Sequence, residues 1–268
     1  MKRVDQPRYR RCVGIDRLRA FIAIPGIWTD AWFEAPDAWW AWVCAWSGWT
    51  FDDWCRYRAT WARSNDSERE ALTLATGIRF FDWRRLPGGS TRASVDAAVE
   101  VLEHHLSCLA PGTDVTVVGH SKGGNVVKAL LQARQARQPK ALVPPGAILD
   151  DRLMSASPNT GVTFSPVTIR AAIICAPVDV VRERIGAALG FGLRPISWQG
   201  TPDGVQVATI TNLYDPSGGR LHGVPNYHVR IWNDHFIPWP PHGMKSGLAR
   251  QVLADLGAVA IPSAHVAS

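Results

Sequence analysis

The chain has 268 residues, of which 46% are hydrophobic and 19% are charged, a balance typical of a globular protein with a sizeable core. Its formal net charge is +6. Much of that charge lies in a basic N-terminal arm, residues 1–17, where no helical or aromatic pattern accompanies it, so we expect no nucleic-acid partner. The five cysteines are an odd number, which argues against a full disulfide framework, and they form no C-x-x-C pair, which argues against a structural zinc site.

Targeting segments are not apparent. The basic start is followed by no apolar run of signal-peptide length, because Asp16, Arg17 and Arg19 interrupt it. No stretch reaches 18 uninterrupted apolar residues, so we expect no integral membrane segment. The expected location is the cytoplasm, and the oligomeric state is not predicted.

Strands and helices are expected to alternate along the chain. Apolar runs at residues 18–26 and 78–83 are typical of buried parallel strands. Helical spacing follows from about Ser90 to Leu109. Further strands are predicted at residues 114–120, 168–177, 205–215 and 228–234, with one helix after residue 121 and another near the C-terminus, capped by Ser246. The alternation predicts one α/β domain over residues 1–268, a mostly parallel sheet of about six strands with helices on both faces.

Two segments stand apart from this alternation. Nine of the 13 tryptophans fall in residues 28–61, mainly at helical spacing. This stripe is expected to pack on the sheet, and some of its rings are candidates for an apolar pocket. Residues 144–161 are polar and marked by proline and glycine, which predicts a loop and a candidate flap.

The stretch VVGHSKGGN, residues 117–125, follows an apolar run and opens a helix. Gly119 and Gly123 flank Ser121 at two residues on either side, which suits a strained turn between closely packed strand and helix. Such a turn would expose the Ser121 hydroxyl as a nucleophile and offer the Lys122 backbone N–H to an oxyanion. The alternative is a glycine turn that binds phosphate, but the stretch fits neither common phosphate-binding pattern.

In this setting the stretch resembles the nucleophile elbow of the α/β-hydrolase superfamily. The resemblance extends over the strand and helix alternation of most of the chain. It implies a three-layer α/β-hydrolase fold and, for the second oxyanion donor, the backbone N–H of Ile27 after Pro25-Gly26. Trp28 and His120 are then candidate substrate-binding residues.

The resemblance also implies the chain order nucleophile, acid, histidine. Asp215 directly follows the fifth predicted strand and is the preferred acid, with Asp179, after the fourth, as the alternative. His242 is the preferred base because its segment is similar to the histidine-to-helix segment of small bacterial lipases. His235, close after the sixth predicted strand, is the alternative base.

The predicted activity is that of a serine esterase or lipase. Ser121 would form an acyl-enzyme with a small-molecule or lipid-like ester that has an apolar acyl or aryl group, without a cofactor. A zinc site made by the evenly spaced His228, His235 and His242 is disfavoured, because no regular element brings them to one face. The alternatives are a thioesterase, amidase or acyltransferase on the same residues, and a non-catalytic module that binds hydrophobic partners through its tryptophans.

Overall fold

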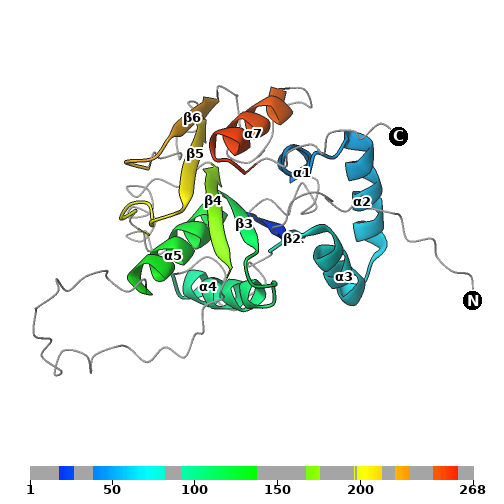
Figure 1. Cartoon of the computed structure of the whole chain (residues 1–268), viewed down its shortest axis with the longest axis horizontal. Helices are drawn as coiled ribbons and strands as arrows, with labels where there is room; N and C mark the ends of the chain where they lie inside the picture. Colours follow the sequence, from blue (N-terminus) through cyan, green and yellow to red (C-terminus); the bar gives the residue numbers. More distant parts are fainter. Residues whose placement is uncertain are drawn as a thin grey trace, which may run out of the picture.

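The computed structural model of the chain describes residues 18–26, 39–81, 92–137, 167–175, 196, 198–212, 221–229 and 244–258 (Figure 1). Strands and helices alternate over most of that length. In chain order the elements are β1 (Arg19–Ile24), α1 (Trp40–Ser47), α2 (Phe51–Arg63), α3 (Asp66–Thr76), β2 (Ile78–Phe80), α4 (Arg92–Ser107), β3 (Asp114–His120), α5 (Lys122–Arg137), β4 (Thr168–Cys175), β5 (Gln206–Asn212), β6 (Asn226–Val229) and α7 (Met244–Asp255).

The six strands form one sheet in the order β2-β1-β3-β4-β5-β6, and every neighbouring pair is parallel. β1 and β3 are buried along almost their whole length, as expected for strands covered on both faces. Pairing of Ile24 with Gly119, and of His120 with Cys175, sets the ends of the three central strands level. The carboxyl ends of β1, β3 and β4 therefore meet at one edge of the sheet.

Helices cover both faces, which makes three layers and confirms the predicted α/β architecture. Alternating side chains of β3 divide between two core clusters, with Val115 and Val117 in one and Val118 in the other. The first cluster packs under α4 and α5, and the second packs under α1, α2 and α7, as the two sides of the sheet in Figure 1 show. None of the helices in the described ranges is long and apolar enough to cross a bilayer.

Several predicted boundaries shift by a few residues. β1 ends at Ile24 before the turn at Pro25-Gly26, and β6 begins at Asn226, two residues earlier than predicted. The cap predicted at Ser246 is wrong, because α7 begins at Met244 and Ser246 lies inside the helix. The N-terminal arm, residues 1–17, lies outside the described residues.

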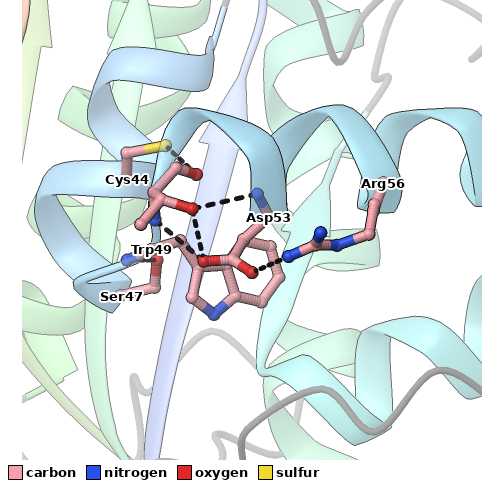
Figure 2. A network of polar contacts seen from close by, with 6 residues as sticks. Cys44, Ser47, Trp49, Asp53 and Arg56 are labelled. Atoms are coloured by element: carbon pink, nitrogen blue, oxygen red, sulfur yellow. Dashed lines mark hydrogen bonds and ion pairs between the residues drawn. The ribbon is translucent and has the colours of Figure 1, made fainter.

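The tryptophan stripe is divided between two helices rather than running along one. α1 ends at Ser47 and is capped by Gly48, whose φ of 73° is the left-handed conformation that glycine adopts without strain. α2 begins with a capping box, in which the Asp53 backbone N–H donates to the Thr50 hydroxyl and the Asp53 carboxylate accepts from the Thr50 N–H. Figure 2 shows this corner, including the Arg56 guanidinium 2.6 Å from the Asp53 carboxylate.

The capping box also sets the charge state of the corner. The hydrogen bond from the Thr50 hydroxyl is the main reason that the pKa of Asp53 lies below its ordinary value, and Arg56 adds to the effect. Beneath the corner, burial raises the pKa of the Cys44 thiol to about 12, so this cysteine stays protonated. We infer that the α1–α2 corner is a structural connection without reactive groups.

Four tryptophans of the stripe belong to the core. Trp39, Trp42, Trp46 and Trp54 are each 1–4% exposed and join the cluster beneath α1, α2 and α7. The packing interpretation therefore holds for these rings. Trp28 and Trp32 lie outside the described residues.

Substitutions of Trp46 test how much its ring stabilises the core. Its ring lies 5.6 Å from the Phe21 ring and 5.8 Å from the Arg19 guanidinium, both at the amino edge of the sheet, and its buried Nε1–H has no hydrogen-bond partner. Trp46→Ala should cost about 3–5 kcal/mol of unfolding free energy. Trp46→Phe should cost less than about 1.5 kcal/mol, because losing the unpaired donor offsets lost contact. Urea unfolding measures both values, and equal costs would contradict this account.

A buried ion pair joins the helices on the other face. Glu103 of α4 is fully buried and accepts two hydrogen bonds from Arg134 of α5, at 2.6 and 2.7 Å. Arg134 also donates to the Val167 carbonyl just before β4, at 3.0 Å. One guanidinium thus connects α4, α5 and the start of β4.

The ends of the segment that contains the candidate flap lie at the amino edge. α5 starts beside the carboxyl end of β3 and ends at Arg137, and β4 starts at Thr168. Residues 144–161 themselves lie outside the described residues. A flap over Ser121 would have to cross from the opposite edge of the sheet, so this role stays a prediction.

Candidate active site

Ser121 lies on the turn between β3 and α5, at the carboxyl edge of the sheet. Its φ is 51°, and it is the one non-glycine residue with positive φ in the part of the chain that the structure describes. Such backbone costs about 1–3 kcal/mol and persists where the surroundings hold it. The Ser121 N–H donates to the Cys175 carbonyl at 2.8 Å, and the Gly124 N–H donates to the Ser121 carbonyl at 2.9 Å. The strain is therefore held by β4 on one side and α5 on the other.

The glycines around Ser121 are required by close approach of three elements. A Cβ on Gly119 would lie 2.6 Å from the Gly123 carbonyl oxygen and 2.7 Å from a methyl group of Val127. A Cβ on Gly123 would overlap the Ile24 carbonyl oxygen and lie 2.6 Å from that of Pro25. Side chains at these positions are excluded by backbone atoms, which cannot rotate away as a side chain can.

Gly123→Ala should damage both stability and activity. The new methyl group would push α5 away from the end of β1, at about 1–3 kcal/mol of unfolding free energy. It would also move the two expected oxyanion donors apart, which should lower kcat for ester hydrolysis by about 10²-fold or more. Unfolding in urea and steady-state kinetics measure these effects.

Gly247→Ala is the matched control. Gly247 lies in α7, and a Cβ there would meet nothing within 4 Å. Replacing a helical glycine in open space should stabilise the protein by up to about 1 kcal/mol and leave kcat unchanged. Equal kcat values for the two alanine variants would contradict the close-approach argument.

The loop that leaves β1 comes directly beside the serine. A Cβ on Gly26 would lie 3.0 Å from the Ser121 Cβ, 3.2 Å from the His120 carbonyl oxygen and 3.3 Å from His120 Nδ1. Both His120 and Ser121 are almost fully buried, at 4% and 8% exposure. The chain after Gly26 therefore starts next to Ser121. Ile27 and Trp28 lie outside the described residues.

The start of α5 supplies positive potential at this point. The helix has 16 residues and begins at Lys122, so the positive end of its dipole faces the turn. Lys122 is only 6% exposed. The helix start can stabilise a negative charge beside Ser121 through its backbone donors.

The remaining candidate residues lie outside the described residues, but the elements that precede or follow them are described. β4 ends four residues before Asp179, β5 ends three before Asp215, β6 ends six before His235, and α7 begins two after His242. In a parallel sheet the ends of β4, β5 and β6 lie at the edge that carries Ser121. Asp215 with its alternative Asp179, and His242 with its alternative His235, stay predictions.

No group of three or more metal-ligating side chains gathers within the described ranges. His228, one member of the disfavoured zinc triplet, lies on β6 with its Nδ1 2.9 Å from the Thr211 hydroxyl.

Two features of the site were not predicted. Gly124 packs against β4, since a Cβ there would lie 2.6 Å from a methyl group of Ile174. The second glycine of the pair after Ser121 was the available signal for that contact. The contact between His120 and Gly26 had no local signal, because it joins the end of β3 to the loop after β1, far apart in the sequence.

Comparisons with known proteins do not place the chain in a family. No protein-family model matches it, and no curated protein matches its sequence. Among solved structures, the chain is similar to a protein from Agrobacterium vitis S4 that is provisionally described as a hydrolase. The two share 15% sequence identity with a TM-score of 0.42, over 89% of this chain and 88% of the other.

Proposed function

We propose that this chain is a serine hydrolase that cleaves carboxylic esters through an acyl-enzyme on Ser121. The observation that carries the proposal is the backbone at Ser121: φ of 51° between β3 and α5, beside Gly26 and the positive end of a helix. A strained serine held between glycines at such an edge suits a nucleophile better than a plain connecting turn. A turn without function would not need this strain.

In the proposed reaction, Ser121 Oγ attacks the ester carbonyl carbon while His242 takes the hydroxyl proton. The backbone N–H groups of Lys122 and Ile27 stabilise the oxyanion. The bond to the leaving alcohol then breaks, and the alcohol takes the proton from His242. A water molecule attacks the acyl-enzyme in the same way, releasing the acid and restoring Ser121. Asp215 accepts from His242 Nδ1–H and orients the ring.

The proposed substrates have an apolar acyl or aryl group, because α1, the first described helix after the loop that leaves β1, is rich in aromatic residues and every buried residue in it except Ser47 is apolar. The same residues could serve thioesters, amides or acyl transfer, and substrate profiling distinguishes these. A module that binds partners through tryptophans is less well supported, since Trp39, Trp42, Trp46 and Trp54 are buried in the core.

Labelling with a fluorophosphonate tests the proposal. The probe should attach one phosphonyl group per chain, on the peptide that contains Ser121, and should abolish hydrolysis of p-nitrophenyl esters. Alanine variants of His242 and His235 then assign the base, and those of Asp215 and Asp179 assign the acid. Absence of both labelling and turnover in the folded wild-type protein would refute the serine-hydrolase proposal.

A further inference from the structure

We propose that His120 is a positioning residue that sets the depth of the loop after β1 and thereby the geometry of the oxyanion site. The inference rests on the proposed function. It concerns a residue that is almost fully buried, with 4% exposure, at the end of β3.

The first argument is the location of the ring. Side chains alternate along β3, and Val118 belongs to the cluster beneath α1 and α7, so His120 points to that same face of the sheet. There its Nδ1 lies 3.3 Å from the place where a Cβ of Gly26 would be. The imidazole is thus in van der Waals range of the glycine that begins the loop.

The second argument is that Gly26 is confined from more than one direction. Ser121 Cβ and the His120 carbonyl also lie close to it, at 3.0 and 3.2 Å from the same Cβ position. On the side of α5, Gly123 abuts the carbonyl groups of Ile24 and Pro25. The end of β1 is therefore held between the first turn of α5 and the His120–Ser121 pair, and the His120 ring is the part of that contact that a substitution can remove.

The third argument is that the proposed reaction tolerates only small displacements of the oxyanion donors. The proposed donors are backbone N–H groups on two separate segments, Lys122 on α5 and the residue after Gly26 on the loop. Donors must be held to within about 0.5 Å of the productive geometry, and a displacement of about 1 Å can cost about 10²-fold in rate. A smaller side chain at position 120 would leave space beside Gly26, into which that residue can move.

The test compares His120→Ala with His120→Asn, whose amide places an atom where the histidine has Nδ1. His120→Ala should lower kcat for p-nitrophenyl esters by about 10- to 10²-fold with KM nearly unchanged, and should slow phosphonylation in proportion. His120→Asn should recover most of that loss. The pH profile of kcat/KM should keep its wild-type shape in both, because His120 is not the base.

The control is His104→Asn, the same change at an exposed histidine of α4 near the amino edge, which should leave kcat unchanged. Rates are expressed per folded molecule, well below the unfolding temperature of each variant. Any one of four results would overturn the proposal. These are a wild-type kcat in His120→Ala, an equal loss of kcat in His120→Asn and His120→Ala, an effect on KM alone, and a shifted pH profile. If the wild-type protein is neither labelled at Ser121 nor active, the proposed function itself fails instead.

Discussion

Replacing Ser121 by alanine is expected to lower kcat for ester hydrolysis by about 10⁵- to 10⁶-fold. The nucleophile and its base act as one unit, so removing the hydroxyl leaves only the small rate that substrate binding and the oxyanion donors supply. Alanine has the same Cβ at φ of 51° and leaves the Ser121 backbone hydrogen bonds to Cys175 and Gly124 in place. The variant should therefore bind substrate with a similar KM and unfold at a similar urea concentration.

Ser107→Ala is the matched control for this variant. The Ser107 hydroxyl donates to the His104 carbonyl at the exposed end of α4, near the opposite edge of the sheet. It should keep wild-type kcat. Turnover by Ser121→Ala at more than about 10⁻³ of the wild-type rate would place the nucleophile elsewhere.

Arg134→Ala is expected to cost about 3–5 kcal/mol of unfolding free energy. The substitution leaves the Glu103 carboxylate buried without its guanidinium, and the Val167 carbonyl without its donor. A carboxylate in that position pays the desolvation cost without the opposing charge. Urea unfolding at neutral pH measures the loss.

Two controls test whether the loss of stability comes from the burial of the Glu103 carboxylate or from the loss of an ion pair alone. Arg170 pairs with Asp114 at 2.9 Å on the surface, and Arg170→Ala should cost no more than about 1 kcal/mol. The double variant Glu103→Leu with Arg134→Met removes both charges and should cost less than Arg134→Ala alone. If Arg134→Ala and Arg170→Ala have equal effects, the buried pair does not hold α4 and α5 together.

The strands could be predicted from the sequence because continuous apolar runs are a strong local signal. β3 is buried along all but its first residue and β4 along its last five, and their predicted and observed bounds nearly coincide. α3 was missed because Thr73 is its only fully buried residue among those described, so its apolar periodicity is weak. Its capping box between Asn65 and Glu68 was the readable signal.

In the candidate site, too, the local features could be predicted from the sequence and the long-range contacts could not. The geometry at Ser121 is encoded within a few residues, since the turn, both glycines and the helix start are consecutive in the chain. The contact between Gly26 and His120 depends on pairing between β1 and β3. Because α1 to α4 separate these strands in the sequence, no local pattern predicts the contact. The choices between Asp215 and Asp179, and between His242 and His235, likewise depend on distant segments and remain predictions.

The β3–β4 pairing has a consequence for how the reactive groups come together. Seven residue pairs, from Asp114 with Thr168 to His120 with Cys175, join the half of the chain that carries Ser121 to the half that carries every candidate acid and base. Two further hydrogen bonds join the same two halves. The Ser121 N–H donates to the Cys175 carbonyl, and Arg134 donates to the Val167 carbonyl. The proposed reaction therefore requires the two halves of the chain to pair in one register. A slip of one residue between β3 and β4 would move the ends of the later strands relative to Ser121.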